Sequence, residues 1–120
     1  MDIRVKATKF KMTGATSDYL EARLRPLERH LGAAADTARC EVEINKAGGD
    51  KQQSDHMWRA EVHIIVPGQK SIYAKNHAAS VNAAIDDVKS EVERQIRKVT
   101  KTSQTARKKA GAKVKRMLRG

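Results

Sequence analysis

The side chains best suited to catalysis or metal binding are few in this sequence, and their spacing joins none of them into a site. There are four histidines and one cysteine, Cys40. His56 and His63 are separated by an odd number of residues, which places two side chains on opposite faces of a regular strand. Asp86 and Asp87 open a helical pattern, where carboxylates suit the helix dipole. Since zinc-ligand spacing and glycine-rich phosphate loops are also missing, we predict a protein without catalysis, metal or cofactor.

Basic side chains are the chemistry in which the sequence is rich. The chain has 120 residues and a net charge of +11, with a pI of about 10.1. Residues 102–120 hold seven lysines and arginines and no acid, which leaves +4 for residues 1–101. Lysine and arginine bind phosphate regardless of base sequence. We therefore expect an anionic partner, with nucleic acid first and an anionic membrane surface second.

The longest amphipathic pattern runs from Ser80 to Lys101 and predicts a helix. Its apolar residues recur every three or four positions: Val81, Ile85, Val88, Val92, Ile96 and Val99. Ser80 suits the N-cap, because its hydroxyl can accept from a free backbone N–H. The opposite face is acidic at its start and basic at its end. A phosphate-binding surface and a solvated face with internal pairs such as Glu93–Arg97 both explain those charges.

A second amphipathic helix is predicted over Met12–Leu31. Thr13 is its expected cap, and its apolar stripe consists of Tyr19 or Leu20, Leu24, Leu27 and Leu31. Pro26 cannot donate a backbone hydrogen bond, so it should kink the last turns. Gly32 is a natural end to the helix, with a linker after it. The arginines lie off the stripe, where a phosphate contact and an ordinary solvated surface are both open interpretations.

Four stretches of alternating apolar residues predict strands: Met1–Phe10, Ala38–Lys46, His56–Val66 and Lys70–Asn76. Pro67-Gly68-Gln69 predicts a hairpin between the last two strands. A helix joins the first two strands, so these can be parallel neighbours, while the other pairs are antiparallel. Each strand has one apolar face. The expected fold class is therefore α+β, in the order β-α-β-β-β-α, with a four-stranded mixed sheet covered on one face by two helices.

The sequence divides into a folded domain, residues 1–101, and a basic tail, residues 102–120. Six bases of this tail form a possible RNA anchor: Arg107, Lys108, Lys109, Lys113, Lys115 and Arg116. A disordered end in the free protein is one interpretation, and Gly111 favours it. A weak amphipathic helix that folds on RNA is the other. The lone cysteine and the lack of a signal peptide or long apolar run predict a cytoplasmic protein.

Two helix signatures, MTGATSDYLEARLRPLERHL and SVNAAIDDVKSEVERQIRKV, together with the order of elements, resemble the ribosome hibernation promoting factor and ribosome-associated inhibitor A family. The resemblance covers residues 1–101 and is strongest in AAIDDVKSEVERQIRK. It implies a fold similar to a double-stranded RNA-binding domain. It also implies a translation inhibitor that docks in the decoding channel of the small (30S) subunit and preserves idle ribosomes under stress. The chain stops where long relatives continue into a dimerising domain, which predicts a short form.

The resemblance further implies that basic residues of both helices contact 16S ribosomal RNA. Four residues match basic positions of the family: Arg23, Arg29, Arg94 and Lys98. Four more are basic neighbours of those positions: Arg25, Lys89, Arg97 and Lys101. Pro26 and Glu91 stand where relatives can carry lysine, which is why Arg25 and Lys89 are included.

Three hypotheses follow for the function. The first is a ribosome binder whose partners are the 30S subunit, its 16S RNA and the 70S ribosome, with no membrane contact and a monomeric state off the ribosome. The second is a general double-stranded RNA-binding module, which has the same fold and charge. The third is an RNA-processing enzyme with an unrecognised site. Aromatic residues make only 3% of the chain, which argues against a platform that stacks single-stranded bases.

Overall fold

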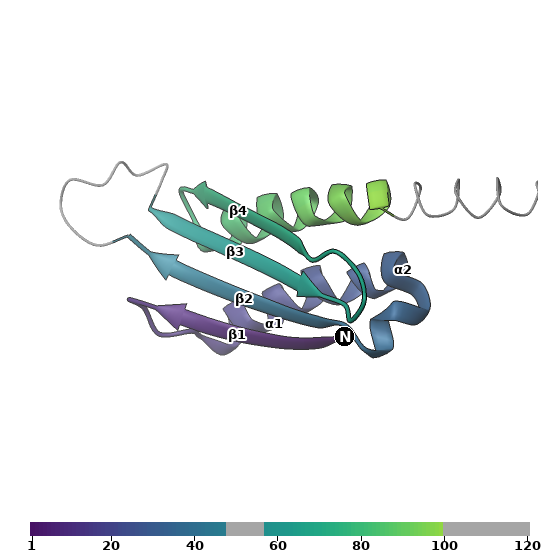
Figure 1. Ribbon diagram of the computed structural model, residues 1–120. Helices are drawn as coiled ribbons and strands as arrows, with labels where there is room; N and C mark the ends of the chain where they lie inside the picture. The colour runs from purple at the N-terminus through teal and green to yellow at the C-terminus, as the bar shows by residue number, and fades with distance from the viewer. Residues whose placement is uncertain (48–56, 100–120) are drawn as a thin grey trace, which may run out of the picture.

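The computed structural model describes residues 1–47 and 57–99 (Figure 1). Its four strands are, in chain order, β1 (Asp2–Thr8), β2 (Arg39–Lys46), β3 (Trp58–Ile65) and β4 (Ile72–Ala78). They form one sheet in the order β1-β2-β3-β4, with β1 parallel to β2 and the other two pairs antiparallel. The predicted mixed sheet and its strand order are therefore confirmed. Residues 48–56, between β2 and β3, lie outside the described residues.

Helical segments occupy two parts of the chain. Between β1 and β2 they are α1 (Gly14–Leu24), the 3-10 segment η1 (Arg25–Leu27), α2 (Glu28–Leu31) and the 3-10 segment η2 (Gly32–Asp36). After β4 a long helix covers residues 81–99, here called the 81–99 helix. Figure 1 shows α1 and the 81–99 helix on the same side of the sheet. The sheet thus has one covered face and one open face, as the one-sided apolar pattern predicted.

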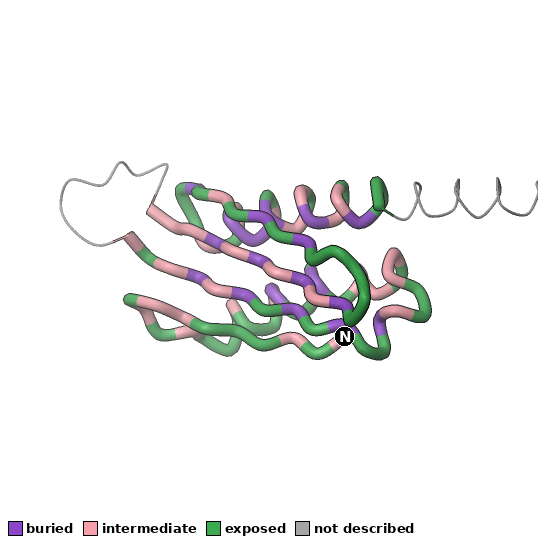
Figure 2. Tube along the Cα trace, viewed as in Figure 1, coloured by how far each residue is buried: buried purple, intermediate pink, exposed green. Residues whose placement is uncertain are grey.

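The core lies between the sheet and the helices (Figure 2). The strands supply inward side chains that include Cys40, Val42, Ile44, Ala60, Val62, Ile64, Ile72 and Ala74. The helices supply Leu20, Leu24, Leu27, Ala84, Ile85, Val88, Val92 and Ile96. No polar or charged residue is fully buried in the described part of the chain. Burial raises the pKa of the Cys40 thiol to about 12, so it is a core residue and a poor nucleophile at neutral pH.

Both predicted helix caps are present. The Thr13 hydroxyl accepts a hydrogen bond from the backbone N–H of Thr16 at 3.1 Å. The Ser80 hydroxyl accepts one from the backbone N–H of Ala83, also at 3.1 Å. Each bond satisfies a donor that has no partner within its own helix. These caps explain why the first helix and the 81–99 helix begin where the sequence predicts.

The predicted hairpin turn after β3 is also present. The backbone N–H of Gln69 donates to the carbonyl of Val66 at 3.1 Å. Gly68 has a φ of +78°, and Pro67 precedes it. Proline at the second position and glycine at the third are the residues that a type II turn requires. This turn sets the antiparallel register in which His63 faces Tyr73.

Two details of the sequence prediction were wrong. The first helix is not one kinked helix: α1 ends at Leu24, and the chain passes through η1 at Pro26 before one further helical turn. Proline cannot donate to a carbonyl four residues earlier, so the tighter 3-10 geometry replaces the α-helix there. The segment after Leu31 was predicted as a linker but forms η2, which begins at Gly32 with a φ of +60°.

Two apolar residues, one in the first predicted strand and one on the stripe of the last predicted helix, are not buried. Val5 is 42% exposed and Val99 is 43% exposed. Val5 belongs to β1, an edge strand with a neighbour on one side only. Val99 ends the described part of the 81–99 helix, and Figure 1 shows this end reaching past the strands. Periodicity predicted the face on which each residue lies but not how far the covering layer extends.

Candidate nucleic-acid interface

The two helices that cover the sheet, α1 and the 81–99 helix, are joined by a small polar contact. The Nε of Arg23 in α1 lies 2.8 Å from the Oδ1 of Asp86, and the Tyr19 hydroxyl donates to the same oxygen at 2.6 Å. This hydrogen bond to Asp86 is the main cause of the raised pKa of Tyr19. Asp86 was predicted only as a dipole-compatible carboxylate. Its role as the acceptor that joins α1 to the 81–99 helix needed the tertiary structure.

Basic residues of α2 and of the 81–99 helix meet in a groove between these two elements. The residues that line this groove are Pro26, Arg29, His30, Lys89, Glu93 and Arg97. Three of the residues predicted to bind RNA (Arg29, Lys89 and Arg97) therefore come together here, although Arg29 is far from the other two in sequence. Arg29 is exposed and makes no ion pair within the described residues. It is thus available to a ligand that enters the groove.

Glu93 lies at the centre of this groove. Its carboxylate pairs with Lys89 and lies 2.5 Å from the Nη2 of Arg97. The Nε2 of His30, from α2, is 3.8 Å away. The hydrogen bond from Lys89 is the largest cause of the lowered pKa of Glu93, and the charges of Lys89, Arg97 and His30 add to it. The Glu93 carboxylate therefore stays ionised at neutral pH.

Arg94 and Lys98 extend the basic surface along the exposed side of the 81–99 helix. Arg94 and Arg97 line a shallow hollow with Lys89 and Glu93, so Arg94 adjoins the groove. Lys98 follows on the same helix and is exposed. We call Arg29, Lys89, Arg94, Arg97 and Lys98 the basic cluster. These five predicted residues form one surface across two elements.

Arg94 has a carboxylate partner of its own. Its Nη2 lies 2.7 Å from the Oε1 of Glu91, and the Gln95 amide donates to the same carboxylate at 3.2 Å. Gln95 also donates to the backbone carbonyl of Tyr73 in β4 at 2.9 Å. The Arg94 guanidinium is thus held along the outer side of the helix while 66% of its side chain stays exposed. Side chains ordered in this way lose less entropy when they bind a phosphate.

The Glu91 carboxyl should titrate far below its ordinary range. The hydrogen bonds from Arg94 first and Gln95 second lower its pKa from 4.5 to about 2. Since the pKa is lower in the folded chain, the pair stabilises the fold above about pH 4.5, and that contribution is lost as the pH falls toward 2. A carbon-detected NMR titration should find Glu91 ionised at pH 3, and Arg94→Ala should raise the pKa clearly. A Glu91 pKa that stays low in Arg94→Ala would contradict this assignment.

Arg25 does not join the basic cluster. It pairs with Glu21 and, through Nη1 at 2.6 Å, with Glu28. The same nitrogen donates to the backbone carbonyl of Met1 at 2.6 Å, and the amino group of Met1 lies 3.7 Å from Glu28. Arg25 therefore fastens the start of β1 to η1, and it does not line the groove beside Arg29. Its prediction as an RNA contact rested on its place in the sequence alone.

The remaining residues that were predicted to bind RNA lie outside the groove or outside the described residues. Arg23 is engaged with Asp86, beside the groove rather than in it. Lys101 and the six tail residues Arg107, Lys108, Lys109, Lys113, Lys115 and Arg116 lie outside the described residues. The internal pair Glu93–Arg97 is confirmed. Five of the predicted bases are paired with carboxylates of the same chain: Arg23, Arg25, Lys89, Arg94 and Arg97. Their positive charge is therefore partly neutralised within the protein.

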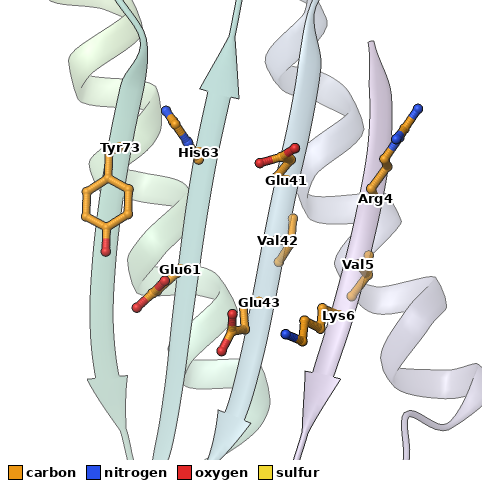
Figure 3. A pocket seen from close by; sticks show the side chains of 9 residues that line it. All are labelled: Arg4, Val5, Lys6, Glu41, Val42, Glu43, Glu61, His63 and Tyr73. Carbon is orange, nitrogen blue, oxygen red and sulfur yellow. The ribbon is translucent and has the colours of Figure 1, made fainter.

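The open face of the sheet offers a contrasting surface. Figure 3 shows a shallow hollow there, where basic side chains of β1 lie beside carboxylates of β2 and β3. The carboxylates are Glu41, Glu43 and Glu61. Tyr73 is 50% exposed, and its ring lies edge-on to the ring of His63 with 6.0 Å between the ring centroids. Three carboxylates in the middle of this face repel phosphate, so the helical face is the better candidate for nucleic acid.

The structure is a small α+β domain whose basic cluster lies on its helical layer. The model of the sigma-54 modulation protein / S30EA ribosomal protein family matches residues 3–104. The chain therefore belongs to this family of ribosome-associated hibernation and modulation factors, which confirms the resemblance seen in the helix signatures. No three His, Cys, Asp or Glu residues of the described part gather as a metal site would need. No helix in that part is long and apolar enough to cross a bilayer.

A solved structure agrees with this family. The N-terminal domain of Protein Y from Thermus thermophilus has 26% sequence identity and a TM-score of 0.65, over 82% of this chain and 99% of that one. A lipoprotein described as putative, from Caulobacter crescentus, reaches 12% identity and a TM-score of 0.37, over 88% of this chain and 91% of that one. That second likeness carries no argument about function. No curated protein matches the chain. The comparison with double-stranded RNA-binding domains stays a prediction.

Proposed function

We propose that the protein binds the small ribosomal subunit through its helical face, in the channel for messenger RNA and the A- and P-site transfer RNAs. Bound there, it blocks translation and preserves idle ribosomes under stress. The observation that carries the proposal is the convergence of Arg29, Lys89 and Arg97 from two elements on one groove, in a chain of a ribosome-associated family. The proposed partners are the 30S subunit with its 16S RNA, and the 70S ribosome. No catalytic step is part of this function.

The geometry supports a ligand that is a folded RNA. RNA helices are recognised mostly by shape and by contacts to the backbone. The basic cluster spreads over α2 and the 81–99 helix, where His30 lies 3.8 Å from Glu93, and Asp86 joins the same helix to α1. Its charges are therefore held at fixed separations. A folded RNA that offers phosphates at matching separations gains several contacts at once. A flexible strand loses conformational entropy when it adopts that arrangement, so it gains less affinity from the same contacts.

The basic tail completes the proposal. We assign residues 1–101 to the ribosome-binding domain and residues 102–120 to an electrostatic anchor. The tail holds +7 of the net charge of +11. Each phosphate that it neutralises releases counterions, which adds affinity that falls steeply with salt. The folded domain would then determine the site, and the tail would add salt-sensitive affinity.

Co-sedimentation tests the proposal directly. The purified protein is centrifuged with 70S ribosomes, 30S subunits or 50S subunits, at low and moderate salt, with and without excess of a long RNA duplex. Saturation near one protein per 30S subunit that survives moderate salt and the competitor is expected. Occupied A and P sites should prevent it. If the duplex competitor removes the protein from the ribosome, the result would instead support a general double-stranded RNA-binding module. Turnover of RNA would support an enzyme.

A further inference from the structure

Glu93 differs from the other carboxylates that pair with the predicted RNA-binding residues. Its side chain is 17% exposed, against 40% for Glu91 and 39% for Asp86. It also contacts basic side chains of two helical elements: Lys89 and Arg97 on its own helix and His30 on α2. Glu93 lines the groove between α2 and the 81–99 helix, whereas Glu91 and Asp86 are not among the residues that line it. An anion is thus already present where a phosphate would bind.

We propose that Glu93 sets the selectivity of this surface, by occupying the place of an RNA phosphate until a folded ribosomal RNA displaces it. The proposal rests on the proposed function and deepens it. In the free protein Glu93 holds Lys89 and Arg97 in position and neutralises them. A short RNA duplex gains little at this groove, because it must compete with a carboxylate that is always present. A ligand that also engages Arg29 and Arg94 gains enough to displace it.

The number of ion pairs before and after binding explains why ribosomal RNA should be preferred over a generic duplex. When one phosphate replaces one carboxylate on Lys89 and Arg97, the number of ion pairs is unchanged, so the exchange by itself contributes little. Net affinity must then come from further contacts, which Arg29 provides in the groove and Arg94 provides in the adjoining hollow. Only a ligand with several phosphates at the right separations reaches them together. Glu93 therefore lowers the affinity for a generic duplex more than the affinity for folded ribosomal RNA, and this difference in affinity is the selectivity.

Glu93→Gln is the decisive variant, because glutamine keeps the shape and removes the charge. Its affinity for a generic RNA duplex should rise roughly tenfold, and the slope of log affinity against log salt should steepen by about one to two, since two cations become free to neutralise phosphates. Its affinity for 30S subunits should change less than about threefold, so selectivity for the ribosome falls. Fluorescence anisotropy with a labelled duplex and with 30S subunits, over a salt series, measures both quantities.

Glu61→Gln is the matched control. It changes the net charge by the same amount but lies on the open face of the sheet, where Glu61 pairs with Arg59. Its duplex affinity should stay within about twofold of the parent chain. An equal gain in Glu61→Gln would show that net charge alone acts, and would overturn the proposal. So would a Glu93→Gln protein that is folded by circular dichroism and binds the duplex with unchanged affinity and slope.

A second variant keeps the proposal testable if Glu93→Gln fails to fold. Lys89→Gln in the parent chain should weaken 30S binding several-fold and leave duplex binding within about twofold, because Glu93 already neutralises Lys89 toward the duplex. Equal weakening toward both RNAs would contradict the proposal. Failure of the proposed function looks different: the parent chain would not saturate on 30S subunits, whatever Glu93 does to duplex binding.

Discussion

Arg94→Glu together with Lys98→Glu is expected to weaken binding to the small ribosomal subunit at least about 100-fold. Hydrogen bonds to charged groups contribute roughly 1.5–3 kcal/mol each, and about 1.4 kcal/mol is a tenfold change in affinity. Two lost phosphate contacts therefore reach 100-fold, and the new carboxylates add repulsion. Both side chains are exposed on the 81–99 helix, so the fold should lose only the small contribution of the exposed Arg94–Glu91 pair. Sedimentation with 30S subunits at fixed salt measures the loss.

The matched control for this variant places the same charge reversal on the open face of the sheet. Lys6→Glu with Lys75→Glu changes the net charge equally, and both residues are exposed there. Its loss of 30S affinity should be under about tenfold, because only long-range electrostatics change. Comparable losses in the two variants would show that total charge determines binding, and the helical face would lose its assignment as the interface.

Val92→Ala is expected to lower the free energy of unfolding by about 2–3 kcal/mol. Val92 is fully buried, at 0% exposure, between the 81–99 helix and the sheet. Removing its methyl groups loses transfer free energy and leaves a cavity. Stabilities of domains this size are about 5–15 kcal/mol, so the loss is a large fraction. The midpoint of urea unfolding, followed by circular dichroism, should fall accordingly.

Val99→Ala provides the control on the same helix and the same apolar stripe. Its side chain is 43% exposed, so the expected loss is within about 0.5 kcal/mol. The comparison holds residue type, helix and sequence period constant and varies burial alone. If Val99→Ala were as destabilising as Val92→Ala, the end of the 81–99 helix would have to be packed more tightly than the structure shows.

The internal pairing of the basic surface affects how all binding measurements should be interpreted. The described residues contain 16 lysines and arginines and 12 acids, so this part of the protein has a net charge of only +4. Much of its positive charge is neutralised within the helical layer by Asp86, Glu91 and Glu93. Strong binding to RNA therefore requires either that these carboxylates are displaced or that the basic tail contributes.

The sequence by itself determined the class of fold and the order of its strands. Alternation in four stretches, two helical stripes, two hydroxyl caps and one Pro-Gly turn are local patterns, and each has a local physical cause. The one-sided alternation of the strands required both helices to cover the same face. The family, too, was recognisable from two helix signatures, because they combine the buried stripe with the charges around it.

The tertiary structure decided which charges work together. Arg25 and Arg29 are four residues apart, yet Arg25 fastens Met1 at β1 while Arg29 lines the groove with Lys89. No periodicity distinguishes these two arginines, because ion pairing depends on distances between elements far apart in the chain. The same reason explains why Asp86 and Glu93 were not recognised as the carboxylates that tie α1 to the 81–99 helix and occupy the groove.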